Sequence, residues 1–264
     1  MYVRHDPETG RRRRLNPAWA AALCLTLAAC MPQGTESEAR MTLFIGIDVS
    51  GSFQNTGHYS EALRFAAHYI YGHLNGLGEL EQPAVLYVGS IGGERPGEAK
   101  SFHPIHDFQG KTVDEIDADL RGWFQPDDIF TDFNPFFERV ATFVKRENLI
   151  LKPITIVIIS DGVPDVTARR TAEQEDARYS QINLEPLEFL SRNVTVRLLY
   201  PSPQVAVRWE QDIARRRVRM WTVDAEVMQG WRGQITPGLP VDQQERLWTW
   251  IDDRVDFRVR RRLL

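Results

Sequence analysis

The feature that most constrains the fold of this chain is the run ITIVIIS at residues 154–160. Five of its seven side chains are apolar, and most of them are β-branched. An apolar run without polar alternation is typical of a strand that is buried on both faces, as the central strands of parallel sheets are. A chain that contains such a strand must supply helices for both faces of the sheet.

The segments around this run alternate between strand-like and helix-like patterns. Further strands are predicted at residues 41–48, 84–91, 194–200 and 218–223, and a short strand near 100–105 is expected to return antiparallel to the second. Helices are predicted at residues 59–74, 113–121, 134–149, 204–215 and 241–256, with a polar helical region between 161 and 192. This order predicts a single α/β domain with a mostly parallel sheet.

The N-terminus has the pattern of an export signal. A basic block, Arg11 to Arg14, precedes an almost continuously apolar stretch at 18–29, which is too short for a stable transmembrane anchor. The next residue is Cys30, and the sequence LAAC at 27–30 resembles the lipobox of bacterial lipoproteins. That resemblance implies a lipidated Cys30 as the mature N-terminus. An ordinary signal peptide cut nearby is the alternative.

These patterns predict three segments. Residues 1–29 form a lipoprotein signal peptide, residues 30–40 a flexible polar tether, and residues 41–264 the folded domain. Because Met31 and not Asp follows the cysteine, the lipoprotein resemblance favours the periplasmic face of the outer membrane over the inner membrane. Cys24 would leave with the signal and Cys30 would be lipidated, so no disulfide is expected.

The charge of the chain bears on its partners. The formal net charge is −4, from 32 basic and 36 acidic residues. Removing residues 1–29 would take away five Arg and two acidic residues, and the remaining 27 basic and 34 acidic residues give −7. An acidic chain of this kind is not expected to bind nucleic acid in general.

Oxygen-bearing side chains follow two of the predicted strands. Asp48, Ser50 and Ser52 follow the first strand, and Asp161 follows the ITIVIIS run. The carboxyl ends of parallel strands meet at one edge of a sheet, so we expect these side chains to lie close together. Two carboxylates in a partly buried site need a cation, and hydroxyl and carboxylate oxygens suit Mg²⁺, Mn²⁺ or Ca²⁺ better than zinc or copper.

The sequence DVSGS at 48–52 resembles the D-x-S-x-S motif of von Willebrand factor type A (vWA) domains, which lines a metal-ion-dependent adhesion site. The resemblance covers roughly residues 41–256. It implies a Rossmann-like vWA fold, with a six-stranded, mostly parallel sheet, one antiparallel edge strand and helices on both faces.

In that family an aspartate after the central strand and a threonine from a preceding loop complete the metal site. Asp161 matches the aspartate, and Thr131 is the best match to the threonine, with Thr142 and Thr112 as weaker candidates. The family often has glycines before this threonine, whereas this chain has Ile129 and Phe130.

The resemblance implies a binding module and not an enzyme. A protein partner would complete the shell of a Mg²⁺-type cation (or Mn²⁺ or Ca²⁺) with an acidic side chain, and Phe130 and Phe133 are possible exposed contacts for it. A metal-dependent hydrolase is one alternative, with His58 as the nearby base. A metal-free structural domain is another. The pair His103 and His106 is expected to be a surface feature and not a metal site.

Overall fold

The computed structural model describes residues 41–93, 102–126, 129–165, 171, 174, 177–190 and 193–257. All of them belong to one compact unit, Ala39–Leu264. The predicted signal peptide, the tether and the basic end of the chain after residue 257 lie outside the described residues. Within the described part of the chain, no helix has the length and apolar character needed to cross a membrane.

Six strands form a single sheet in the order β3-β2-β1-β4-β5-β6. Their bounds are Met41–Asp48 (β1), Pro83–Ile91 (β2), Phe102–Pro104 (β3), Ile154–Ile159 (β4), Val194–Leu199 (β5) and Arg219–Val223 (β6). All neighbouring pairs are parallel except β2 and β3, which are antiparallel. This is the strand order of doubly wound Rossmann-type sheets.

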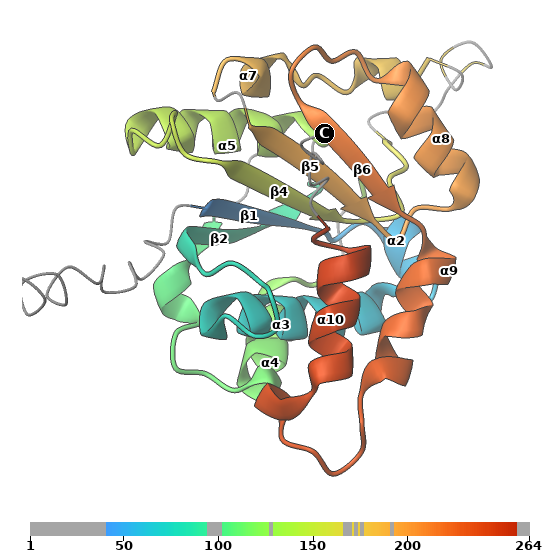
Figure 1. The fold of residues 1–264 in the computed structure, drawn as a ribbon. Helices are drawn as coiled ribbons and strands as arrows, with labels where there is room; N and C mark the ends of the chain where they lie inside the picture. Colours follow the sequence, from blue (N-terminus) through green and yellow to red (C-terminus); the bar gives the residue numbers. More distant parts are fainter. Residues whose placement is uncertain are drawn as a thin grey trace, which may run out of the picture. The chain divides into compact units, whose positions relative to one another are not determined.

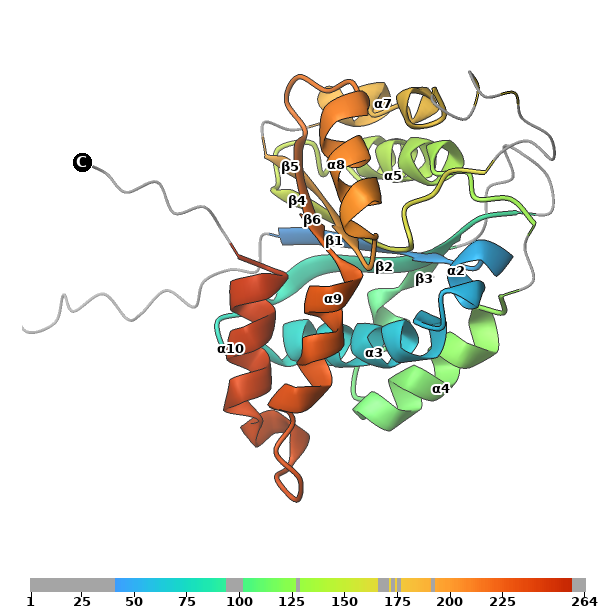
Figure 2. The same cartoon turned by 90° about the vertical axis from the view of Figure 1, so that its right-hand side faces the viewer.

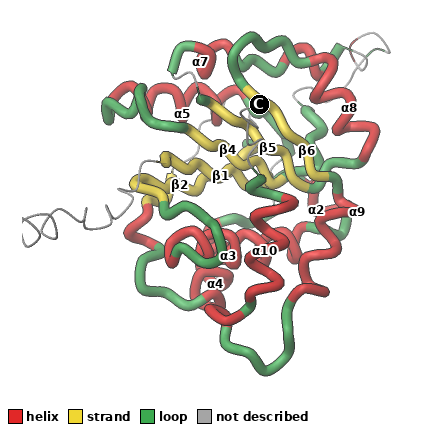
Figure 3. The backbone as a smooth tube through the Cα atoms, in the orientation of Figure 1, coloured by secondary structure: helices red, strands yellow, loops and turns green. Residues whose placement is uncertain are grey.

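Helices cover both faces of the sheet (Figures 1 and 3). One face carries α3 (Tyr59–Asn75), α4 (Val113–Trp123), α9 (Ala225–Met228), η4 (Gln229–Gln234) and α10 (Glu245–Arg254), and the other carries α5 (Asn134–Arg146), α7 (Glu185–Glu188) and α8 (Pro203–Asp212). The short helix α2 (Gly51–Asn55) follows β1 at the end of the sheet (Figure 2). The predicted α/β class, with its one antiparallel edge strand, is confirmed.

The two central strands are buried on both faces, as the apolar run predicted. Each residue of β1 is buried, and five of the six residues of β4 are buried. Successive side chains of these strands point to opposite faces and pack into two hydrophobic clusters, one on each side of the sheet. Leu43, Ile45 and Val157 belong to the α3 side, whereas Phe44 and Ile156 belong to the α5 side.

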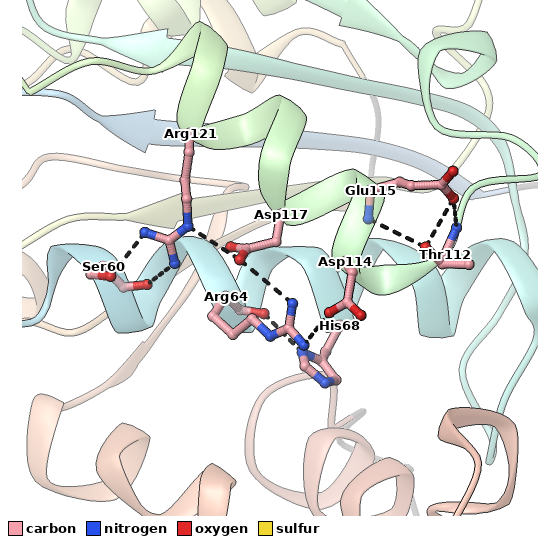
Figure 4. A network of polar contacts seen from close by, with 8 residues as sticks. All are labelled: Ser60, Arg64, His68, Thr112, Asp114, Glu115, Asp117 and Arg121. Atoms are coloured by element: carbon pink, nitrogen blue, oxygen red, sulfur yellow. Dashed lines mark hydrogen bonds and ion pairs between the residues drawn. The ribbon is translucent and has the colours of Figure 1, made fainter.

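Helix α4 begins with a capping box and is joined to α3 by ion pairs (Figure 4). The Thr112 side chain accepts from the backbone N–H of Glu115, and the Glu115 carboxylate accepts from the backbone N–H of Thr112. Arg64 of α3 lies 2.6 Å from Asp114, and Asp117 accepts from Arg121 at 3.1 Å. Apolar residues Val113, Ile116 and Leu120 form the buried face of α4 beneath this polar layer.

Several helix boundaries in the structure differ by a few residues from those predicted from the sequence. Helix α5 ends at Arg146 and not at 149, because Asn148 adopts a left-handed conformation (φ 55°). The last helix was expected at 241–256, but a 3-10 turn, Val241–Gln243, precedes α10. Of the polar helical region predicted between 161 and 192, the described residues include η3 (Tyr179–Gln181) and α7.

Candidate metal centre

Two carboxylates lie at the carboxyl edge of the sheet, where the strand order changes direction. Asp48 is the last residue of β1, and Asp161 comes two residues after the end of β4. The two strands are parallel neighbours, with Ile47 opposite Ile159. The chain runs from β1 to β2 and β3 on one side, then returns to β4 on the other. Ligands of open α/β sheets bind at such a switch point.

Asp48 is held rigidly within the sheet edge. It is fully buried, and its Oδ1 accepts a hydrogen bond from the backbone N–H of Ser50 at 2.9 Å. Its Oδ2 accepts from the hydroxyl of Ser160 at 2.5 Å. The same Ser160 oxygen accepts from the backbone N–H of Gly162 at 2.9 Å, so Ser160 joins the ends of β1 and β4. Sequence reasoning missed this role, although Ser160 directly precedes Asp161.

The two serines of the motif continue this network toward solvent. Ser50 is buried and Ser52 is exposed, and their hydroxyl oxygens lie 3.0 Å apart. Ser52 also hydrogen-bonds the carboxylate of Asp161. Ser50 is the N-cap of α2, with extended backbone angles and a long contact of 3.5 Å from the N–H of Phe53. A capping serine is therefore present, but capping alone does not explain the link from Ser52 to Asp161.

Thr131 reaches the same edge from a separate loop. Phe130 forms a bridge with Gly93, which follows β2, and Thr131 forms a bridge with Asp165, which follows β4. The backbone bonds between Thr131 and Asp165 are both 2.9 Å long. Because β1 lies between β2 and β4, these two bridges carry the loop across the end of β1, where Asp48 lies.

The hydroxyl of Thr131 is the least satisfied group at this edge. Thr131 is fully buried, and its Oγ1 has no hydrogen-bond partner among the described residues. A buried hydroxyl without a partner costs about 1–3 kcal/mol, and a ligand, an ion or a water that bound it would offset that cost. The donor set of two carboxylates and three hydroxyls consists of hard oxygens and fits a divalent cation of the Mg²⁺ type.

Electrostatics at the site also favour a cation. Burial, followed by the negative charge of Asp161, raises the pKa of Asp48 from 3.8 to about 7. Burial likewise raises the pKa of Asp161, while hydrogen bonds from Val163 and Ser52 and the charge of Arg178 oppose the shift. Two buried acids that resist ionisation together are stabilised by a positive ion. In the described part of the chain, no three His, Cys, Asp or Glu side chains cluster, so the hydroxyls are essential to the proposed ligand set.

Gly162 and Trp209 position the loop that carries Asp161. Gly162 has φ 74°, and a Cβ atom at this position would lie 2.7 Å from Leu198 and 3.1 Å from the indole nitrogen of Trp209. That indole donates to the Gly162 carbonyl at 2.7 Å. Trp209 is fully buried in α8. Its role depends on a contact across 47 residues, which no local pattern reveals.

Other predicted candidates take different places. Thr112 caps α4, and Thr142 is exposed on α5. His58 is the N-cap of α3, with its ring centroid 6.0 Å from that of Tyr200. His103 stacks on Trp123 at 3.9 Å and lies 3.3 Å from Asp107.

The prediction that Phe133 is an exposed partner contact is wrong. Only 1% of Phe133 is exposed, and its ring packs edge-on against Trp209 at 5.1 Å. It is buried because it directly precedes α5, whose apolar face packs on the sheet. The neighbouring Ile129, which is 69% exposed, is the prominent apolar side chain of this loop.

Comparisons with known proteins give similarity only among solved structures. No protein-family model matches the sequence, and no curated protein matches it. Proximal thread matrix protein 1 (PTMP1) from the mussel byssus is 11% identical with a TM-score of 0.42, over 81% of this chain and 48% of its own. The match thus spans about half of that protein's length.

Two further structures give similar values. The SpRpn10 VWA domain is 13% identical with a TM-score of 0.40, over 81% of this chain and 95% of that domain. PTMP1 with a zinc occupied MIDAS motif is 11% identical with a TM-score of 0.38, over 72% of this chain and 44% of its own. These scores are low, so the description of the fold rests on its own strand order and register.

Proposed function

We propose that this chain is a vWA-type binding module that engages a protein partner through a divalent cation. The observation that carries the proposal is the buried, unpaired hydroxyl of Thr131, held across the strand ends that present Asp48 and Asp161. The ligand set would be Asp48, Ser50, Ser52, Thr131 and Asp161, with Mg²⁺ as the preferred ion and Mn²⁺ or Ca²⁺ as alternatives.

Each side chain would have a defined part in binding. Asp48 is fixed by Ser160 and by the N–H of Ser50, so its carboxylate is oriented before any ion arrives. Ser52, which is exposed, marks the side from which a partner would approach. When bound, the cation would offset the charges of Asp48 and Asp161 and present a coordination position to an acidic side chain of the partner.

Binding, and not catalysis, is the activity that we propose. Hydrolysis needs a general base within hydrogen-bonding reach of the reacting water. His58, the candidate base, begins α3 and faces Tyr200, and no hydrogen bond joins its ring to the described site residues.

We also propose that Cys30 carries a lipid and that the domain acts at the cell envelope, at the periplasmic face of the outer membrane.

A thermal-stability experiment with matched variants tests the metal site. Saturating Mg²⁺, at about 100 times Kd, should stabilise the wild type by about 2.7 kcal/mol and raise Tm by roughly 5–10 °C. Asp48→Asn and Thr131→Val should show no such rise. In EDTA, both variants should be at least as stable as the wild type, because each removes an unfavourable buried group.

Asp253→Asn is the matched control, since Asp253 is an exposed carboxylate on α10. It should keep the full response to Mg²⁺. Equal melting curves for the wild type in EDTA and in each of Mg²⁺, Mn²⁺ and Ca²⁺ would show that the metal site is wrong. A metal response with no EDTA-sensitive recovery of envelope proteins on the immobilised chain would instead reject the binding function.

A further inference from the structure

The edge of the sheet opposite the metal centre gathers the connections that lead into four parallel strands. Residues 147–153 lead into β4, and residues 213–218 lead into β6. The N–H of Thr42, at the start of β1, donates to Pro153 at 2.9 Å, and the N–H of Ile154 donates to Asn193 at 3.0 Å. These bonds place the starts of β1, β4 and β5 side by side, and β6 begins beside β5 with Arg219 opposite Thr195. All four starts lie at the end of the sheet away from α2 (Figure 1).

The part of this edge where β4, β5 and β6 begin is basic, although the whole chain has a net charge of −4 and Glu79 and Glu81 precede β2 at the same edge. We define the basic edge by seven cationic residues of the connections and adjoining helix and strand ends: Lys145, Arg146, Lys152, Arg215, Arg216, Arg217 and Arg219. Four acidic residues accompany them, Glu147, Glu185, Glu188 and Asp212, so the local balance is seven minus four, or +3. The opposite edge carries the metal-site carboxylates.

A buried acid binds the backbone of two of these arginines. Glu188 is 8% exposed, and its carboxylate accepts the backbone N–H groups of Arg216 and Arg217 at 2.5 and 2.6 Å. These bonds fix the backbone at Arg216 and Arg217, and both residues are exposed. Neither side chain forms an ion pair within the described residues, so their charge is not neutralised locally.

Exposed apolar side chains stand among these cations. Leu151 is 95% exposed and precedes Lys152, while Ile150 is 36% exposed and Phe189 is 71% exposed. A hollow of about 430 Å³ lies beside Phe189 and is also lined by Arg215 and Arg216. Apolar side chains surrounded by cations are typical of surfaces that enter the headgroup region of a membrane.

We propose that the basic edge binds the surface of a bilayer rich in anionic phospholipid. The arginines and lysines would contact headgroup phosphates, while Leu151 and Phe189 would enter the interface. Residues 30–40, which begin with the proposed lipidation site Cys30, precede β1, and β1 begins at this same edge. The metal centre at the far end of β1 would then face away from the membrane.

Vesicle flotation with the full chain tests this proposal. The partition coefficient is measured on vesicles of phosphatidylcholine alone and on vesicles that also contain phosphatidylglycerol, and the ratio of the two is compared between variants. The residues before Met41 are common to all variants, so any contribution from them cancels in that comparison. Arg216→Gln with Arg217→Gln should lower the ratio about 25-fold at low salt, since each cation near an anionic surface contributes about fivefold.

The matched control is Arg232→Gln with Arg246→Gln, which removes two exposed cations from η4 and α10. It should leave the ratio unchanged, and Arg216→Lys with Arg217→Lys should retain it. Leu151→Ser should weaken binding to the anionic vesicles several-fold, whereas Leu239→Ser, at a 45% exposed site, should not.

The edge variant is Arg216→Gln with Arg217→Gln. If its ratio equals that of the control, Arg232→Gln with Arg246→Gln, the proposal is overturned. Binding of duplex DNA that is lost in the edge variant, without any preference for phosphatidylglycerol, would overturn it in favour of nucleic acid. Because both arginine side chains are exposed, the melting curves of Arg216→Gln with Arg217→Gln and of the wild type should coincide. If the glutamine variant melts at a lower temperature, Arg216→Lys with Arg217→Lys decides instead. Its ratio must then match that of the wild type, and a lower ratio would overturn the proposal.

Discussion

Asp48 combines complete burial with a second acid at the same edge of the sheet, and its ionisation is therefore coupled to stability. In the folded chain its pKa is raised from 3.8 to about 7, chiefly by burial. The folded state then holds a proton that the unfolded state has released between these two pH values. Stability contributed by the neutral acid is present below about pH 4 and is lost as the pH rises toward 7.

This linkage predicts a pH dependence that an ion should reverse. In EDTA, the free energy of unfolding of the wild type should fall between pH 5 and pH 7 by up to about 1.4 kcal/mol per pH unit relative to Asp48→Asn. Affinity for Mg²⁺ should rise over the same interval, because the ion binds the ionised carboxylate. Urea unfolding and Mg²⁺ titration at each pH measure both. Parallel curves for the wild type and Asp48→Asn would contradict the raised pKa.

At the scale of single elements, α4 shows how local sequence specifies a helix boundary. Thr112 and Glu115 satisfy each other's backbone N–H groups, and the spacing T-x-x-E is visible in the sequence. The apolar face then follows at residues 113, 116 and 120. The α4 start was predicted correctly because both signals are local.

Replacing Thr112 tests the capping role and separates it from metal binding. Thr112→Ala should lower the free energy of unfolding by about 1 kcal/mol, because the cap of α4 is lost. Thr142→Ala, at an exposed position of α5, should change it little or raise it slightly, since alanine favours helix. Both variants should keep the Mg²⁺ response in thermal melting. Loss of that response in either would reassign the threonine ligand.

At the scale of the whole molecule, a buried ion cluster ties the end of the chain to its first half. Arg197 of β5 donates to the carbonyls of Val255 at 2.7 Å and Phe257 at 2.9 Å. Its Nε lies 3.7 Å from Asp256, which also accepts from the Tyr69 hydroxyl at 3.1 Å. Arg197 and Asp256 are both about 5% exposed. Removing one partner should leave the other charge buried and uncompensated.

Asp256→Ala should therefore destabilise the fold by about 3–5 kcal/mol. Asp253→Ala, three residues earlier and exposed, should stay within about 0.5 kcal/mol of the wild type. Urea unfolding of the full chain measures both. A loss below about 1 kcal/mol for Asp256→Ala would mean that the cluster contributes little to stability.

The sequence by itself determined the layered α/β architecture and two of the site positions. The ITIVIIS run required a strand covered on both faces. Asp48 ends β1 and Asp161 comes two residues after β4, so their shared edge is a consequence of parallel pairing. These features are read from neighbours along the chain. The choice of Thr131 over Thr112 and Thr142 had to be carried by resemblance, because no local pattern identifies a threonine as a metal ligand.

Only the tertiary structure decided which distant groups meet. Ser160 contacts Asp48 across 112 residues, and Trp209 holds Gly162 across 47. The bridges to Gly93 and Asp165 bring Thr131 across the end of β1. Phe133 is buried because it directly precedes α5, whose apolar face packs on the sheet. The basic edge likewise exists only because four strand starts lie side by side. Local pattern fixes the elements, whereas long-range pairing fixes which side chains share a site.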